Sequence, residues 1–144
     1  MDQRTSNPAV ATLLATLLLL IVGRPLAQDK PEELAQSSAE SWLALVDAGN
    51  YAQSWEQAAA FFKGAVTKER WQQMLSARRG PLGKMVSRKL KSATYTKTLP
   101  GAPDGEYVVI QYESSFEHKQ SAIETVTSML DKDGQWRVSG YFIK

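Results

Sequence analysis

The sequence contains no cysteine, and its 144 residues include a single histidine, His118. The lack of cysteine excludes disulfides, thiol nucleophiles and cysteine-based metal sites. One histidine leaves little room for a Ser-His-Asp set, and no serine lies in a nucleophile-elbow pattern. The glycines form no phosphate-binding loop. The net charge of +2 is too small to predict a nucleic-acid partner. We therefore predict no cofactor, no metal and no catalytic residue set.

The N-terminal segment holds the longest hydrophobic stretch. An apolar run of 15 residues covers positions 9–23, which is shorter than the roughly 20 residues that a membrane-spanning helix needs. The run is typical of a secretory signal peptide with cleavage after Ala27, although Pro25 departs from that pattern. An uncleaved membrane anchor is the alternative. We expect an exported protein, periplasmic or secreted, with a signal peptide at 1–27 and a single domain at 28–144.

Three amphipathic helices are predicted in the first half of the mature chain. The first begins with Asp29 as its cap and ends at Gly49, the second covers 51–64, and the third begins with Thr67 as its cap and ends at the segment RRGPLG. Helical spacing places these residues on apolar stripes: Leu34, Trp42, Leu45, Val46, Tyr51, Trp55, Ala58, Ala59, Phe62, Trp71, Met74 and Leu75. We interpret the stripes as core rather than as a ligand box, because amphipathic helices bury their apolar face.

From Met85 onward the composition and the punctuation by glycine, proline and aspartate indicate strands. We predict four, at about 85–99, 106–117, 121–131 and 135–143. The connections are too short for a helix, so neighbouring strands should be antiparallel. Alternation places these residues on one face of their strands: Val108, Ile110, Tyr112, Phe116, Ala122, Val126, Leu130, Trp136, Val138 and Phe142. The sequence thus predicts an α+β fold, with three N-terminal helices packed on one face of a four-stranded antiparallel sheet.

The segment DKDG between the last two strands is either a turn or a fragment of a metal site. A two-residue turn would set Leu130 opposite Arg137, whereas a three-residue loop at 132–134 sets Leu130 opposite Trp136. The longer loop, with Gly134 left-handed, aligns the apolar faces. A calcium loop would need further oxygen ligands at fixed spacing, which the sequence does not supply. We predict a hairpin.

Five segments of the mature chain are distinctive: WLALVDAGNYAQSWEQAAAFF, RGPLG, SRK, GEYVVIQYE and QWRVSGY. They resemble the bacterial "domain of unknown function 4019" family, whose members are small exported proteins. The resemblance extends from about Ala39 to the end of the chain. It implies an α+β layout similar to cystatin-like or NTF2-like folds, with the helices cradled by a curved antiparallel sheet. It implies no activity, because the family is defined without one.

Charge is distributed unevenly along the chain. Residues 70–103 contain eight basic side chains and no acid, whereas residues 104–133 contain seven acids and two lysines. We interpret this as pairing between neighbouring strands, for example Lys91 with Glu113. The alternative is a basic patch for an anionic partner such as lipid headgroups. The basic residues outside the strands, which are the candidates for a partner patch, are Arg78, Arg79 and Lys84.

Glu124 is the acid of greatest interest. Alternation places it on the same face as Ala122 and Val126, close to the rim of the sheet. A carboxylate in a semi-apolar cavity can act as an acid, a base or a hook for a ligand. An ion pair with Arg88, or an exposed rim position, is the interpretation that we favour. The candidate ligand-binding residues are Glu124, Arg88, Tyr112 and Tyr95.

We predict a non-enzymatic exported module that binds a small ligand or a protein partner. The binding surface would be the concavity between helices and sheet, or the basic corner at RRGPLGK. One alternative is an enzyme that uses Glu124 as a general base and a tyrosine as a hydrogen-bond donor. Another is an envelope-associated protein that contacts anionic lipid.

Overall fold

The computed structural model describes residues 29–144, so the expected signal peptide at 1–27 lies outside the described residues. The helices are α1 (Pro31–Asp47), α2 (Tyr51–Glu56), α3 (Ala60–Ala65) and α4 (Lys68–Arg78), and a 3-10 turn, η1 (Gly80–Leu82), follows α4. The strands are β1 (Met85–Thr96), β2 (Tyr107–Phe116), β3 (Lys119–Leu130) and β4 (Trp136–Ile143). None of the helices in this part of the chain combines the length and the apolar character that crossing a membrane requires.

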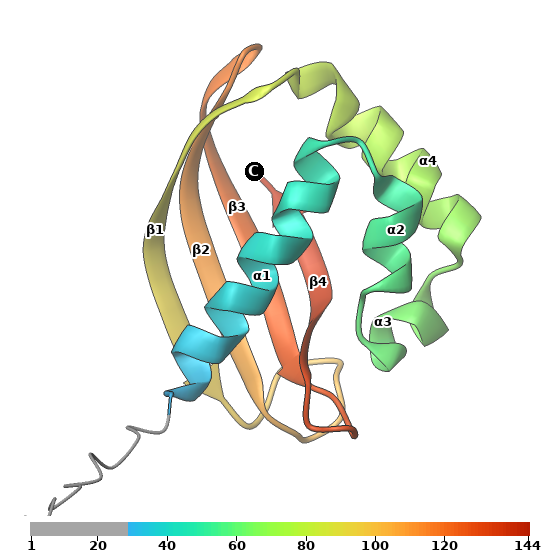
Figure 1. Cartoon of the computed structure of the whole chain (residues 1–144), viewed down its shortest axis with the longest axis vertical. Coiled ribbons are helices and arrows are strands. Elements are labelled where there is room, and N and C mark those ends of the chain that lie inside the picture. The colour runs from blue at the N-terminus through green and yellow to red at the C-terminus, as the bar shows by residue number, and fades with distance from the viewer. Residues whose placement is uncertain (1–28) are drawn as a thin grey trace, which may run out of the picture.

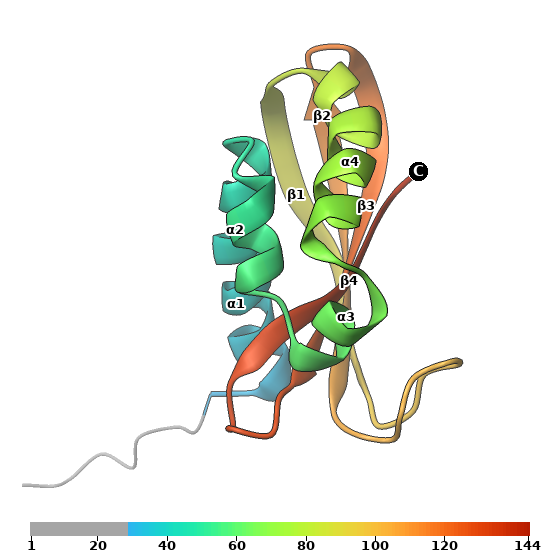
Figure 2. The ribbon, with the colours of Figure 1, turned by 90° about the vertical axis from the view of Figure 1, so that its right-hand side faces the viewer.

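The four strands form one antiparallel sheet in the order β1-β2-β3-β4. Each strand pairs with its neighbour in the sequence, as expected where turns and loops connect them. The sheet is curved, and α1 crosses its concave face, with α2, α3 and α4 beyond α1 on the same side (Figure 1). Figure 2, a quarter-turn away, shows α4 in front of the upper part of the sheet. The predicted α+β class, with helices on one face of a curved sheet, is confirmed.

One predicted helix is in fact two. Residues 51–64 form α2 and α3 with a short break between them. The backbone of Ala59 is extended, and its N–H donates to the carbonyl of Val138 on β4 at 2.8 Å. Asp131 then accepts a hydrogen bond from the N–H of Ala60 at 3.1 Å, at the start of α3. Hydrogen bonds to the sheet and to the hairpin therefore replace helical hydrogen bonds at Ala59 and Ala60. The apolar spacing of this segment does not indicate the break.

The start and the buried face of α1 also differ from the prediction. Lys30 rather than Asp29 is the N-cap residue, and no side chain caps this end. Leu34, expected in the apolar stripe, is 43% exposed. The buried residues are Ala35, Ala39, Trp42, Leu43 and Val46. The two alanines have small side chains, so they allow the α1 backbone to approach the sheet closely. In α4, Thr67 accepts a hydrogen bond from the N–H of Arg70, as predicted.

Aromatic side chains pack between the helices and the sheet. The indole N–H groups of Trp42 and Trp71 both donate to Ser54, at 2.7 Å to its carbonyl and 2.9 Å to its hydroxyl. The two indole rings lie 6.0 Å apart, and the ring of Phe62 packs edge-on to Trp71 at 4.9 Å. The interpretation of the aromatic stripes as core is confirmed for the aromatic residues, whereas Met74, predicted on the stripe of α4, is 42% exposed.

The last hairpin has the predicted register. Leu130 lies opposite Trp136. The N–H of Asp131 donates to the carbonyl of Gln135 at 2.8 Å, which leaves a three-residue loop between them. Gly134 has a φ of +81°, the left-handed conformation that such a loop requires.

The two aspartates of this hairpin serve its turn and a neighbouring helix. Asp131 accepts from the start of α3, and Asp133 accepts two hydrogen bonds of 2.7 Å from Arg137. The Arg137 hydrogen bonds lower the pKa of Asp133 to about 2. Within residues 29–144, no three histidine or acidic side chains converge where they could hold a metal ion.

A bulge reverses the predicted alternation at the end of β4. The pairing with β3 skips Ser139, which is therefore an extra residue in β4. Because one extra residue shifts every later side chain to the other face, Tyr141 and Ile143 lie opposite helix-facing residues of β3. Phe142, predicted to face the core, is 59% exposed.

A second bulge sets the register of β1. Lys91 is the extra residue, and Lys89, not Lys91, lies opposite Glu113. The predicted pair of Lys91 with Glu113 is therefore wrong. Arg88 lies opposite Ser114, which places it on the helix-facing side of the sheet. Among the described residues of β1, Arg88 alone forms ion pairs, and its partners lie on α1 and β3, so the pairing predicted between the charges of β1 and β2 is not found.

We predict that Gly83→Ala destabilises the chain far more than Gly134→Ala. Both glycines have positive φ, but Gly83 lies in a region that only glycine readily adopts, and an added Cβ would lie 2.6 Å from Glu117 Oε2. At Gly134 nothing lies within 4 Å of the added Cβ. Urea denaturation of the full chain should show a loss in the free energy of unfolding of about 3 kcal/mol for Gly83→Ala and of about 1 kcal/mol for Gly134→Ala. Equal losses would contradict the crowding at Gly83.

Candidate functional site

A buried polar network joins the helices to all four strands. Its centre is the carboxylate of Glu124 on β3, which is 0% exposed. Arg88 of β1 donates to Oε1 from Nε at 2.8 Å, and the hydroxyl of Ser114 on β2 donates to the same oxygen at 2.6 Å. The hydroxyl of Tyr141 on β4 donates to Oε2. Each strand therefore contributes one member, and the predicted ion pair of Glu124 with Arg88 is confirmed.

Arg88 extends the network to the helices. Its Nη1 and Nη2 donate to the two carboxylate oxygens of Asp47, at the end of α1, at 2.7 and 3.0 Å. Arg79, which follows the last residue of α4, donates to the same carboxylate at 3.2 Å. Two guanidinium charges thus balance the carboxylates of Asp47 and Glu124. Such balance is needed because an unpaired charge in the interior costs several kcal/mol.

Two groups of the network, Arg88 and Tyr141, have raised pKa values. Burial by itself would lower the pKa of Arg88, but hydrogen bonds to Asp47 and Glu124 outweigh it, and the pKa is raised. Burial strongly raises the pKa of the Tyr141 hydroxyl, and the nearby charge of Glu124 raises it further. Arg88 therefore remains charged, and Tyr141 remains a proton donor.

Arg79 is an anchor rather than a free cation. It is 3% exposed, its Nη1 donates to the carbonyl of Gly83 at 2.6 Å, and its guanidinium lies 4.4 Å from the ring centre of Phe116. Both terminal nitrogens of Arg79 are bound within the protein, so the prediction that this side chain is free for a partner is wrong. Its Nε is buried and has no hydrogen-bond partner among the described residues.

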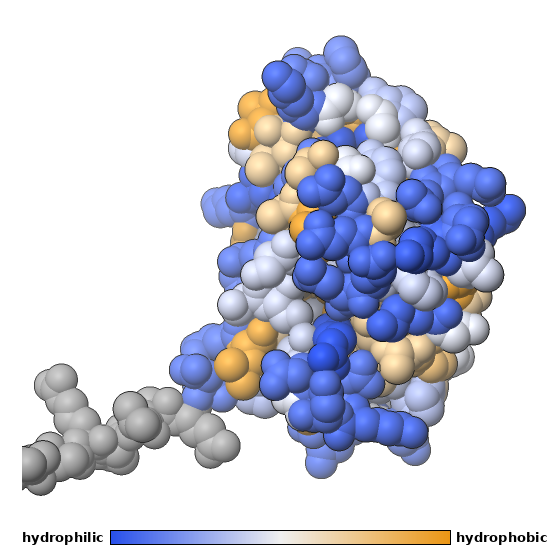
Figure 3. All heavy atoms as spheres, turned by 45° about the vertical axis from the view of Figure 1, so that its right-hand side comes forward, coloured by the Kyte–Doolittle hydropathy of each residue, from blue (hydrophilic) through white to orange (hydrophobic). Residues whose placement is uncertain are grey.

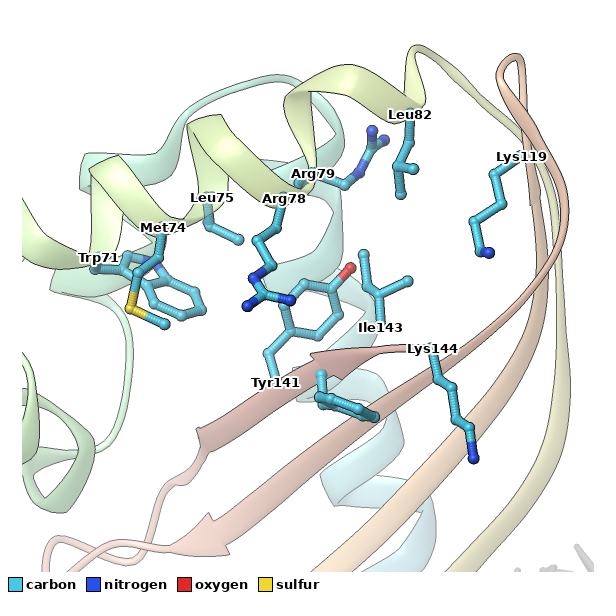
Figure 4. Close-up of a pocket in the computed structure, with 11 residues that line it drawn as sticks. Trp71, Met74, Leu75, Arg78, Arg79, Leu82, Lys119, Tyr141, Ile143 and Lys144 are labelled. Atoms are coloured by element: carbon cyan, nitrogen blue, oxygen red, sulfur yellow. The ribbon is translucent and has the colours of Figure 1, made fainter.

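A cleft of about 440 Å³ lies beside this network, between α4 and the ends of β3 and β4. Its apolar wall consists of Trp71, Met74, Leu75, Leu82, Tyr141, Phe142 and Ile143. In Figure 4, the side chains of α4 extend toward β4, and Tyr141 rises from β4 toward α4. Tyr141 therefore belongs both to the cleft and to the network beneath it.

The charged residues that line the cleft are all basic: Arg78, Arg79, Lys119 and Lys144. Figure 4 shows Arg78 reaching from α4 toward Tyr141, and Lys119 reaching toward the cleft from the hairpin between β2 and β3. Within residues 29–144, neither Arg78 nor Lys119 has a carboxylate oxygen within 4.0 Å. The cleft therefore combines an apolar wall with cations that lack an acidic partner in the described part of the chain.

The four predicted ligand-binding residues do not come together in the cleft. Glu124 and Arg88 lie beneath it in the network, where their contacts are to protein groups. Tyr112 is buried, burial raises its pKa to about 12, and its hydroxyl has no partner among the described residues. Tyr95 donates to Glu106 at 2.8 Å at the opposite end of β1. None of the four lines the cleft.

The predicted basic patch divides in a similar way. Arg78 is exposed and lines the cleft, whereas Lys84 is exposed but lies outside it. Sequence reasoning missed Lys119, which it placed in the connection between the second and third strands, and it did not single out Tyr141 in the fourth strand. No local signal identifies either residue, because their positions depend on the bulge at Ser139 and on where α4 lies above the sheet.

We predict that Glu124→Gln lowers the free energy of unfolding by about 3–5 kcal/mol, because it leaves Arg88 and Arg79 facing only the charge of Asp47. Glu113→Gln, an exposed acid on β2, is the matched control and should change little. Urea denaturation is the measurement.

A double-mutant cycle tests whether the network acts as a unit. Arg88→Met together with Glu124→Gln restores the charge balance, so the pair should lose less than the sum of the single losses. Additive losses would show that these two side chains are not coupled.

Two comparisons with known proteins complete this description. No curated protein matches the chain. The family described as "Protein of unknown function (DUF4019)" matches residues 38–141, a range that includes the network and all of the cleft except its last three residues. Because that match covers most of the sequence, the chain belongs to the DUF4019 family.

Proposed function

We propose that the chain is an exported, non-enzymatic module that binds a ligand in the cleft between α4 and the ends of β3 and β4. The observation that carries the proposal is the cleft itself. Its volume of about 440 Å³ falls within the roughly 300–1,000 Å³ that ligand pockets occupy, and its wall is mainly apolar with a few charged groups.

The chemistry of the buried acid supports binding over catalysis. A general base must come within hydrogen-bond reach of the proton that it abstracts from the substrate. Glu124 is fully buried and does not line the cleft, and Arg88, Ser114 and Tyr141 already donate to its two oxygens. Tyr141 does line the cleft, but its hydroxyl is committed to Glu124. The arrangement therefore suits a scaffold better than a reaction centre.

On the side that bears the helices, the outer surface favours ligand binding in the cleft over protein docking on a broad apolar face. Hydrophilic residues dominate the face shown in Figure 3, and the hydrophobic residues there form small separate groups. Large contiguous apolar patches are the usual mark of a protein–protein interface. The apolar surface around Trp71 and Leu75 is instead recessed between α4 and the sheet.

We predict that the full chain binds the neutral fluorophore N-phenyl-1-naphthylamine in this cleft. Met74→Trp, which adds volume at the cleft wall, should weaken binding about tenfold or more. Leu34→Trp, an exposed apolar residue on α1 outside the cleft, is the matched control and should leave binding unchanged. Fluorophore emission, titrated to saturation, is the measurement. Equal affinities for the two variants would place the bound probe elsewhere, for example on the N-terminal apolar run, and would overturn the proposal.

Export has its own test. The apolar run at 9–23 and the site after Ala27 predict that the product recovered from the bacterial periplasm or medium begins at Gln28. Placing two arginines at Leu18 and Leu19 should abolish this processing, and N-terminal sequencing of the product measures it. A membrane-bound product that begins at Met1 would indicate the uncleaved anchor instead.

A further inference from the structure

We infer that the cleft takes an amphipathic carboxylate, a small molecule with an apolar body and one anionic head. This inference deepens the proposed function and rests on it. Two independent features lead to it. One is the apolar wall, and the other is the sign and the pairing of the charges around it.

The wall selects an apolar body. Trp71 and Leu75 on α4 face Tyr141 and Ile143 on β4 across the cleft. Trp71 donates its indole N–H to Ser54, and Tyr141 donates its hydroxyl to Glu124. Their polar atoms are thus used within the protein, so their rings present apolar surface to a ligand.

The charges select an anionic head. No acidic side chain lines the cleft, while four basic ones do, although Lys144 extends away from α4 in Figure 4. One of the four, Arg79, is neutralised by Asp47, and Arg88 beneath the cleft pairs with Asp47 and Glu124. Arg78 and Lys119 have no such partner among the described residues, and they reach toward the cleft from two different elements (Figure 4). A ligand anion would be their acidic partner.

The accessible cations are few, which favours a singly charged head. Arg79 lines the cleft, but its Nε is shielded from solvent and its terminal nitrogens are bound within the protein, so it adds no open donor for a ligand. A carboxylate has two oxygens and can accept from more than one donor, and its planar shape matches the guanidinium fork of Arg78. We therefore favour a carboxylate over a multiply charged phosphate, which would need more cations.

The test compares three probes that share one apolar chain, each kept below its micelle-forming concentration. They are decanoate, decanol and decyltrimethylammonium, titrated into the full chain by calorimetry, with tryptophan emission followed in parallel because Trp71 lines the cleft. We expect decanoate to bind about tenfold or more tighter than decanol, since charge-assisted hydrogen bonds are the stronger kind. The ammonium probe should bind weakest, and added salt should reduce the preference for decanoate.

Variants that remove a single positive charge show which residues cause the preference for decanoate over decanol. Arg78→Gln and Lys119→Gln should each weaken decanoate binding while decanol binding stays unchanged. Lys91→Gln is the matched control, since Lys91 is an exposed lysine on β1 outside the cleft. A decanoate affinity that survives in the Arg78→Gln/Lys119→Gln double variant would overturn the inference.

The remaining outcomes separate this inference from the proposed function. If the chain binds the neutral naphthylamine in a Met74-sensitive manner but shows no preference for decanoate over decanol, the cleft binds ligands and only the anionic head is wrong. If neither probe binds, the proposed function fails as well. If anionic phosphatidylglycerol vesicles bind the chain while free decanoate does not, the occupant is a bilayer surface and the inference is wrong.

Discussion

The buried carboxylate of Glu124 constrains the rest of the structure, because a charge in the interior is tolerated only where its partners surround it. Those partners, Arg88, Ser114 and Tyr141, come from the other three strands. A slip of one residue between two strands would turn one of these side chains to the opposite face and leave the carboxylate without it. The ion pair itself is a weak source of stability, yet it strongly penalises the alternative registers. The ion pair therefore favours one strand register of the sheet over the alternatives.

Features that depend on neighbours along the chain are predictable from the sequence. The loop that ends in Gly134 follows from matching the apolar faces of the two strands it joins, so the pairing of Leu130 with Trp136 could be derived. The cap at Thr67 is equally local. Strand alternation also placed Glu124 on the helix-facing side with Arg88 as its partner, because period-two patterning decides the face of each residue. The class of the fold follows from these elements together.

Features that depend on contacts distant in sequence are not predictable in this way. An extra residue such as Ser139 leaves no mark on the alternation, yet it moves Phe142 out of the core and Tyr141 in. The break between α2 and α3 arises from the hydrogen bond of Ala59 to Val138, a residue that is distant in the sequence. The cleft is of the same kind, since it is formed between α4 and β4 and neither element signals it alone.

The way α4 is attached explains why a cleft exists at all. This helix packs against α2, and it is tied at both ends: Trp71 to Ser54 near its start, and Arg79 to Asp47 and Gly83 just past its end. A helix tied at its ends to other helices and to a turn need not press its middle onto the sheet. On the opposite wall, Tyr141 is fixed by its hydrogen bond to Glu124, so its ring cannot rotate freely to fill the space. The polar network and the apolar cleft thus depend on the same contacts, because the hydrogen bonds of Arg79 to Asp47 and of Tyr141 to Glu124 also hold the two walls of the cleft apart.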